Sequence, residues 1–290
     1  MKLTEIVAER GFAVTAEVAP PKGADPSEVL AEAREIGAHV DAINVTDGQG
    51  ATMRMSPLAV ARLMIEEGLT PVWQITCRDR NRIALQGDLL AADALGVENA
   101  LIVTGDHMVL GDHPGAKPVF GLDSVQLLHV AGEMRAGRDL AGNEMASPLR
   151  LSTGAVVAPE ADNIDLQLIK LRKKIDAGAE FIQTQAVFEP AAFARFMQRA
   201  ELAGIPVLAG IIPVTSPRVA RFMNARIPGV NVPTWVIQLL NEAEMGDRKR
   251  VGAEIAGQIA HAILPACQGL HIMARGGADL LPGILEMAGV

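Results

Sequence analysis

The segment Ala100-Leu101-Ile102-Val103-Thr104-Gly105-Asp106 decides the fold that this sequence predicts. An apolar run delivers an acidic residue onto a glycine turn, and several other short apolar runs also end in a polar residue before a helical pattern. The carboxyl ends of the strands of a closed parallel barrel meet at one rim, where the loops build the active site. We therefore expect the polar strand-end residues to converge there: Glu17, Thr46, Gln74, Asp106 and Gln185.

Eight such runs alternate with helical patterns, and their apolar content is nearly continuous, as in parallel strands covered on both faces. The sequence predicts a single α/β domain over residues 1–290, a (β/α)₈ TIM barrel with extra helices at 233–243 and 248–263 before the last strand. An open doubly wound sheet is the main alternative, but the Gly-x-Gly-x-x-Gly fingerprint is absent. The expected strands are 13–19, 41–46, 71–76, 100–104, 151–156, 181–185, 207–212 and 269–273; the other expected helices are 27–36, 57–67, 80–95, 123–136, 161–177, 191–203, 218–224 and 278–288.

Composition narrows the function classes. Hydrophobic residues make up 49% of the 290 residues, enough for a large core, and a net charge of −8 without a basic tail argues against nucleic acid as a partner. The two cysteines are too few for a disulfide framework, and the six scattered histidines suggest no metal site. No apolar run reaches about 18 residues, so no membrane span is expected. Residues 1–14 lack the apolar centre of a signal peptide, so a cytoplasmic protein is expected.

The rim residues have both chemical and structural interpretations. Glu17 lies in an apolar strand, where desolvation would raise its pKa and suit it to general acid catalysis, or where it pairs with a basic residue of the barrel. Asp106 either places negative charge beside a cofactor or developing cation, or caps the following loop. Gln185 suits an amide-rich heterocycle, or satisfies loop carbonyls. Lys173 and Lys174 either hold phosphate or form a solvated helix face.

Six short motifs follow one another along the chain: Ala16-Glu17-Val18-Ala19-Pro20-Pro21, Asn44-Val45-Thr46, Ile75-Thr76-Cys77, Gly105-Asp106, Leu171–Ala179 followed by Thr184-Gln185, and Gly210-Ile211-Ile212-Pro213-Val214. Each motif is weak, but six in this order are specific. Together they resemble the 5,10-methylenetetrahydrofolate reductase family over nearly the whole chain. Residues 44–47 and 77–81 also resemble a divergent branch of that family found with corrinoid and one-carbon pathways.

The resemblance implies a flavin-dependent oxidoreductase that reduces 5,10-methylenetetrahydrofolate to 5-methyltetrahydrofolate, a step of one-carbon metabolism and methionine biosynthesis. Hydride passes from NADH or NADPH to flavin N5 and then to the folate. By position, Glu17 is the general acid and Asp106 is a second catalytic residue near the flavin and the folate. Gln185 contacts the pterin, and Phe222 stacks on the substrate. Flavin-contacting positions correspond to Thr46, Gln74, Thr104, Gly105, Asp106, Gly154 and Lys174.

Several flavin-contacting positions depart from the family pattern. Gln74 replaces a histidine and Thr104 an arginine, while Gly154, Ala158 and Gln167 stand where the family has tyrosine, histidine and aspartate. We therefore expect the adenine half of FAD to be held weakly. FAD is the expected cofactor and FMN the alternative.

Other partners follow from the same resemblance. Electrons come from a nicotinamide or from a partner protein subunit, and a homo-oligomer is expected. Two alternatives remain: a pterin-binding barrel that transfers a methyl group to a corrinoid partner, and a flavin-free docking subunit. Glu17 and Asp106 argue against the docking subunit, because docking requires neither carboxylate inside the barrel.

Overall fold

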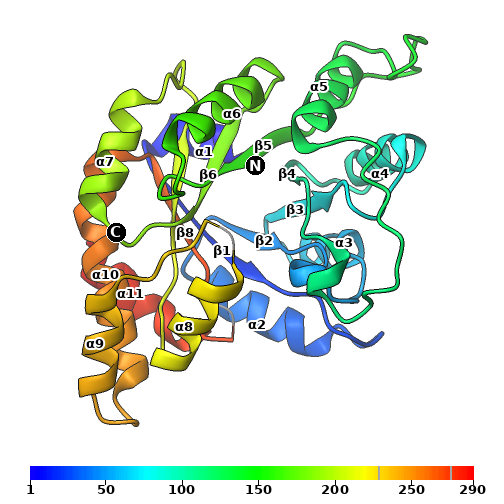
Figure 1. Ribbon diagram of the computed structural model, residues 1–290. Helices are drawn as coiled ribbons and strands as arrows, with labels where there is room; N and C mark the ends of the chain where they lie inside the picture. The colour runs from blue at the N-terminus through cyan, green and yellow to red at the C-terminus, as the bar shows by residue number, and fades with distance from the viewer. Residues whose placement is uncertain (228, 275) are drawn as a thin grey trace.

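The computed structural model describes residues 1–227, 229–274 and 276–290. Eight parallel strands follow one another in chain order around a closed barrel, and β8 pairs with β1 to complete it (Figure 1). The predicted barrel is therefore confirmed, and each strand end lies within one residue of its expected position. The strands are β1 Ala13–Val18, β2 Ala42–Val45, β3 Pro71–Thr76, β4 Asn99–Val103, β5 Ser152–Val157, β6 Phe181–Ala186, β7 Val207–Ile211 and β8 Gly269–Ile272.

Helices surround the barrel and pack on the outward-facing apolar residues of the strands. The extra helices expected before the last strand are present as α9 and α10. The helices are α1 Leu3–Arg10, α2 Ser27–Gly37, α3 Pro57–Glu66, α4 Arg82–Ala94, α5 Ser124–Arg135, α6 Ile164–Asp176, α7 Pro190–Arg199, α8 Pro217–Arg226, α9 Thr234–Glu242, α10 Arg248–Ile263 and α11 Leu281–Ala288, with 3-10 turns η1 Gln49–Ala51, η2 Met108–Leu110, η3 Leu264–Ala266 and η4 Ala278–Leu280. Within the described residues, none of these helices is long and apolar enough to cross a membrane.

Side-chain caps fix where several helices begin at the rim. Asn81 accepts hydrogen bonds from the first turn of α4, Asp123 does so for α5, Asn163 for α6 and Ser216 for α8. A capping oxygen satisfies backbone N–H groups that the first helical turn leaves without a partner. The loops between strands and helices therefore end at defined points, and these loops surround the barrel mouth.

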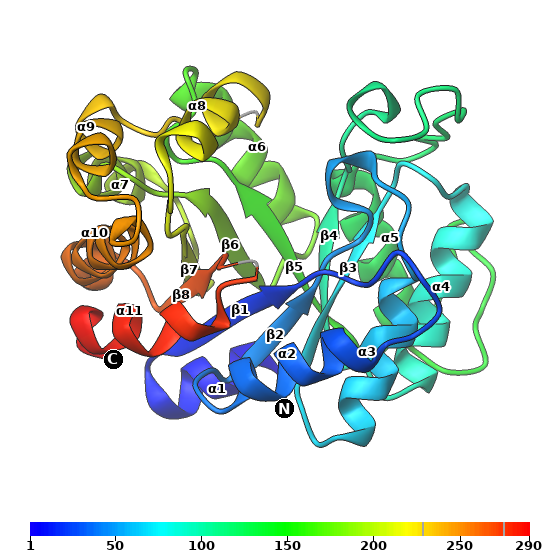
Figure 2. The ribbon, with the colours of Figure 1, turned by 90° about the horizontal axis from the view of Figure 1, so that it is seen from below.

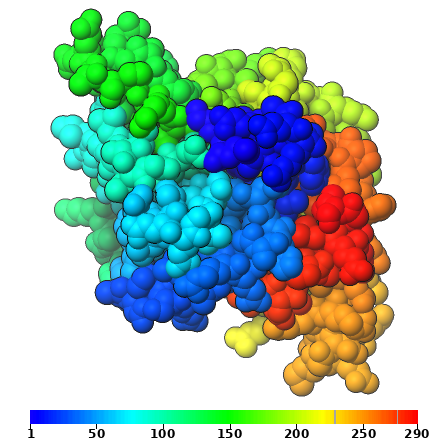
Figure 3. Space-filling model, turned by 180° about the vertical axis from the view of Figure 1, so that it is seen from behind, coloured from blue at the N-terminus to red at the C-terminus, as the bar shows by residue number. Residues whose placement is uncertain are grey.

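The other end of the barrel is closed by α1, a helix that the sequence analysis did not predict. Leu3 and Ile6 of α1 pack on the lowest layer of the barrel interior, and the Leu3 amide donates to the Asn99 side chain at 2.8 Å. Figure 3 shows this N-terminal segment, in dark blue, lying across the middle of the rear face. The layer beneath it consists of Ala13, Ala42, Val72, Leu101, Phe181 and Leu208.

The opposite end of the barrel stays open. Figure 2 shows α8 and the loop that follows β4 on either side of it. The candidate site lies between these two segments.

Candidate active site

A cavity of about 330 Å³ occupies the barrel mouth at the carboxyl ends of the strands. Most of the polar residues that were expected at the carboxyl ends of the strands line this one cavity, although they come from strands far apart in the sequence. The prediction that they converge is therefore supported by the geometry. The predicted site residues that line the cavity are Glu17, Gln74, Thr104, Gly105, Asp106, Lys174 and Gln185.

A second cavity of about 540 Å³ continues outward from the first. The two cavities share Gln49, Asp106 and Gln185. Phe222, on α8, lines the outer cavity and leaves 59% of its surface exposed. Arg226 lines it from the same helix. The mouth therefore has two connected compartments, one lined by Glu17, Gln74 and Lys174 and one that contains an exposed aromatic ring.

Two predicted flavin contacts lie outside the lining of both cavities. Thr46 is buried at the end of β2, and its hydroxyl has no hydrogen-bond partner among the described residues. Gly154 lies within β5, where an added Cβ would come within 2.2 Å of the Phe181 ring. Glycine at this position is required by packing inside the barrel. A flavin contact at Gly154 remains a prediction from the family resemblance alone.

Glu17 is buried in the inner cavity beside a histidine that the sequence analysis did not select. The Nε2 atom of His271, on β8, lies 3.8 Å from the Glu17 carboxylate, and its Nδ1 lies 2.9 Å from the Thr15 hydroxyl. Complete burial lowers the pKa of His271 to about 4, so the imidazole is neutral at neutral pH. Glu17 therefore faces a neutral ring that is held in place by Thr15.

A layer of buried hydrogen bonds lies beneath Glu17. The Asn44 amide donates to the Gln183 side-chain oxygen at 2.7 Å, and Gln183 donates back to Asn44 at 3.1 Å and to Thr15 at 3.3 Å. These bonds connect β1, β2 and β6. Such a layer fixes side-chain positions because each buried polar group would be costly to leave unpaired.

The alternation of residues along the strands could have revealed this layer from the sequence. Alternate residues of a strand point to the same face. The residue two positions before a rim residue therefore points into the barrel: Thr15 precedes Glu17, Asn44 precedes Thr46, and Gln183 precedes Gln185. His271 has the same relation to Met273, which also lines the inner cavity.

Asp106 connects two loops at the junction of the cavities. Its carboxylate accepts a hydrogen bond from the Gly50 amide at 2.8 Å, and its backbone carbonyl lies 3.4 Å from the Arg78 guanidinium. Gly105 has a φ of +94°, and an added Cβ would lie 3.0 Å from the Cβ of Thr76. The Thr-Gly-Asp turn therefore requires glycine. Asp106 acts as a structural link and also presents negative charge to both cavities.

Lys174 reaches the inner cavity from α6. Its amine donates to the Val156 carbonyl at 2.5 Å and forms no ion pair within the described part of the chain. Burial, with a smaller contribution from Lys170, lowers the pKa of Lys174 to about 8. The Thr104 and Ser124 hydroxyls, 3.1 Å apart, line the same cavity at the start of α5. An amine and two hydroxyls are donors that suit a phosphate group.

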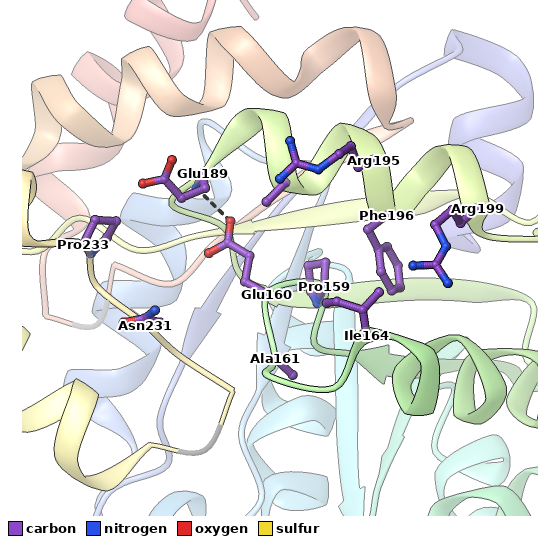
Figure 4. A pocket seen from close by; sticks show the side chains of 11 residues that line it. Pro159, Glu160, Ala161, Ile164, Glu189, Arg195, Phe196, Arg199, Asn231 and Pro233 are labelled. Carbon is purple, nitrogen blue, oxygen red and sulfur yellow. Dashed lines mark hydrogen bonds between the residues drawn. The ribbon is translucent and has the colours of Figure 1, made fainter.

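A separate cavity of about 400 Å³ lies outside the barrel (Figure 4). Glu160 accepts hydrogen bonds there from the Phe188 and Glu189 amides, and burial raises its pKa. Arg195 and Arg199 of α7 also line this cavity. None of the predicted site residues lines this cavity.

Comparison with known proteins assigns the family. The family model described as methylenetetrahydrofolate reductase matches residues 2–289. This chain belongs to the methylenetetrahydrofolate reductase family. The resemblance noted in the sequence is thereby confirmed, as is the prediction of an enzyme of this oxidoreductase family.

Curated relatives match most of this chain. The 5,10-methylenetetrahydrofolate reductase of Pectobacterium carotovorum subsp. carotovorum is 26% identical over 96% of this chain and 90% of its own length. The Salmonella typhimurium enzyme of the same name is 29% identical over 74% of this chain and 68% of its own.

Two solved structures illustrate the fold. A Clostridium thermocellum protein that binds two copies of 5-methyl-5,6,7,8-tetrahydrofolic acid superposes with a TM-score of 0.70 at 15% identity, covering 99% of this chain and 98% of its own. A 2,3-dimethylmalate lyase superposes at 0.52 with 14% identity, covering 99% of this chain and 84% of its own. At these identities the likeness establishes the barrel fold.

Proposed function

We propose that this chain reduces 5,10-methylenetetrahydrofolate to 5-methyltetrahydrofolate with a bound flavin, and that the barrel mouth is the site. The observation that carries the proposal is the position of Glu17, Asp106 and Gln185 in one cavity of a chain that belongs to this family. The Clostridium thermocellum protein, which binds 5-methyltetrahydrofolic acid on a similar barrel, supports the choice of ligand.

Each of these residues has a role that its chemistry supports. The Gln185 amide both donates and accepts hydrogen bonds, which suits the amide-like edge of a pterin. Glu17 gives a proton to the substrate nitrogen that leaves as the five-membered ring opens to the iminium. The negative charge of Asp106 stabilises that cation. Phe222 offers an exposed ring for the aromatic part of the substrate.

The neutral His271, held by its 2.9 Å hydrogen bond with the Thr15 hydroxyl, lies 3.8 Å from the Glu17 carboxyl and limits where that carboxyl can move. A positioned acid of this kind contributes about 10²–10⁴-fold to a rate.

The residues of the inner cavity fit a flavin. Gln74 and Thr104 would supply polar contacts for its ring and ribityl chain, and Lys174, which forms no ion pair with a described carboxylate, would supply a cation for its phosphate. Thr46 and Gly154, which line neither cavity, are assigned to the flavin by the family resemblance alone. When bound, the flavin supplies the hydride that reduces the iminium carbon.

The residues of this chain give less support for binding of the adenine half of FAD. Gly154, Ala158 and Gln167 replace side chains that contact the dinucleotide in the family. We propose FAD as the cofactor, bound less tightly than is usual, with FMN as the alternative. NADH, NADPH or a partner subunit supplies the electrons, and the single barrel domain works as a homo-oligomer.

Anaerobic single turnover tests the proposal. The protein is loaded with FAD or FMN, reduced with dithionite in stoichiometric amount, and mixed with 5,10-methylenetetrahydrofolate. Flavin reoxidation at the same rate as 5-methyltetrahydrofolate formation is expected. Binding of 5-methyltetrahydrofolate without flavin binding, and without product formation, would instead favour the methyl-transfer alternative.

A further inference from the structure

Asp47 is a buried carboxylate of the inner cavity that has no role in the proposed function so far. It follows Thr46 at the end of β2, leaves 8% of its surface exposed and lines the inner cavity. One of its oxygens, Oδ2, accepts hydrogen bonds from the Thr76 amide at 2.8 Å, from the Thr76 hydroxyl at 3.0 Å and from the Arg80 guanidinium at 2.7 Å. These contacts connect the ends of β2 and β3 and compensate the negative charge.

The second carboxylate oxygen of Asp47, Oδ1, is left without a partner. It accepts no hydrogen bond from a residue within the described ranges 1–227, 229–274 and 276–290. An ionised carboxylate only accepts hydrogen bonds, and the polar atoms of buried side chains nearly always have a partner. Asp47 also borders a further cavity of about 410 Å³, where Arg80 lies, but Oδ2 is the oxygen that meets Arg80. Oδ1 is therefore the oxygen that remains for a ligand of the inner cavity.

The inner cavity carries donors on one side and this acceptor on another. Lys174 on α6, together with Thr104 and Ser124 between β4 and α5, suits a phosphate group, whereas Asp47 lies where β2 and β3 end. A flavin nucleotide matches both features, because its side chain carries a phosphate and its oxidised ring has a single N–H group, at N3. We propose that Asp47 is a ligand-binding residue whose Oδ1 accepts a hydrogen bond from the N3–H group of the flavin ring. This inference rests on the proposed function, because it names a further contact of the same site.

The hydrogen bonds to Oδ2 make Asp47→Asn an informative change. Donors from Thr76 and Arg80 surround the position of Oδ2, so the asparagine side-chain oxygen must occupy it and the NH₂ group must take the place of Oδ1. The variant keeps the contacts with Thr76 and Arg80, but it presents a donor where the native protein presents an acceptor. An N–H group of a ligand then meets a second N–H group, and the charge-assisted hydrogen bond is lost.

Equilibrium titration of the apoprotein tests the inference without relying on turnover. The ligands are FMN and 3-methyl-FMN, in which a methyl group replaces the hydrogen on N3. We expect wild type to bind FMN about 10- to 100-fold more tightly than the methylated compound. Asp47→Asn should weaken FMN by a similar factor and reduce the difference between the two compounds.

Asp88→Asn is the matched control. It neutralises the other carboxylate that pairs with Arg80, at 2.7 Å, and Asp88 lines neither the inner nor the outer cavity. This variant should bind both compounds as wild type does. Thermal unfolding shows whether both variants are folded, and the comparison of FMN with 3-methyl-FMN in wild type needs no variant.

Equal affinity of wild type for FMN and 3-methyl-FMN would overturn the inference and leave the proposed function intact. The same preference in wild type and in Asp47→Asn would also overturn it, because the methyl group would then act through its size alone. An equal loss of FMN binding in Asp88→Asn would assign the effect to Arg80 instead. If Asp47→Asn weakens 5-methyltetrahydrofolate and not FMN, the carboxylate serves the folate and the inference is wrong. If wild type binds neither flavin, the proposed function fails together with this inference.

Discussion

The Nε2 atom of His271 lies 3.8 Å from the carboxylate of Glu17, and both side chains are buried in the barrel mouth. Because burial holds the pKa of His271 near 4, the ring stays neutral wherever the enzyme would normally work. The pair therefore places a carboxyl next to an uncharged imidazole.

The low pKa of His271 predicts a loss of stability in acid. An unfolded histidine takes up its proton near pH 6.5, whereas the folded one takes it up near pH 4. The contribution of His271 to the free energy of unfolding is therefore fully present above pH 6.5. About 3 kcal/mol is lost as the pH decreases toward 4. Denaturant unfolding of wild type and of His271→Asn between pH 7 and 4 measures the difference. If both proteins lose stability equally over this range, the assigned pKa is wrong.

The buried hydrogen bonds between Asn44 and Gln183 predict a coupled pair. Gln183→Met removes two hydrogen bonds of Asn44 at once and should lower the free energy of unfolding by about 2 kcal/mol. The double variant with Asn44→Leu should lose less stability than the sum of the two single changes, because it leaves neither amide of the pair without its partner. Gln198→Met, on the exposed surface of α7, is the control. Strict additivity of the two core changes would contradict the network.

The close packing of Gly154 against the Phe181 ring predicts the effect of adding a methyl group at this position. Gly154→Ala places a methyl group against the Phe181 ring and should lower the free energy of unfolding by about 1–3 kcal/mol. Gly87→Ala, in α4 where an added Cβ meets nothing within 4 Å, should raise it by about 0.5–1 kcal/mol. Thermal unfolding compares the two, and Phe181→Leu should recover part of the loss. A Gly154→Ala protein as stable as wild type would show that packing does not explain this glycine.

The sequence alone predicted the strands and the rim residues, but not helix α1 or His271. The eight strands were predictable because continuous apolar runs alternate with capped helices, and the rim residues followed from the end of each run. Helix α1 was missed because its eight residues bury only Leu3 and Ile6. His271 was missed because a single histidine in an apolar strand resembles a core residue. Its partners become evident only when β8 pairs with β1 and brings it beside Thr15 and Glu17.

The position and charge of Lys174 lead to a prediction about flavin phosphate binding. Lys174→Met should weaken FMN binding about tenfold and leave riboflavin, which has no phosphate, unaffected. Because the pKa of Lys174 is about 8, its charge is present below pH 8, and the affinity for FMN should fall as the pH rises above that value. Fluorescence titration of the apoprotein with FAD, FMN and riboflavin at pH 7 and 9 measures both effects. FAD binding far tighter than FMN binding, and unchanged in Lys174→Met, would show that other residues hold the nucleotide.

In the proposed mechanism, Glu17 protonates the folate in the barrel mouth. The most direct measurement is stopped-flow reoxidation of the reduced flavin by 5,10-methylenetetrahydrofolate in Glu17→Gln, with Glu98→Gln at the opposite end of the barrel as control. We expect a rate about 10²–10⁴-fold below wild type in Glu17→Gln, with flavin binding and 5-methyltetrahydrofolate binding retained. Reoxidation of Glu17→Gln at a rate close to that of wild type and Glu98→Gln would contradict it.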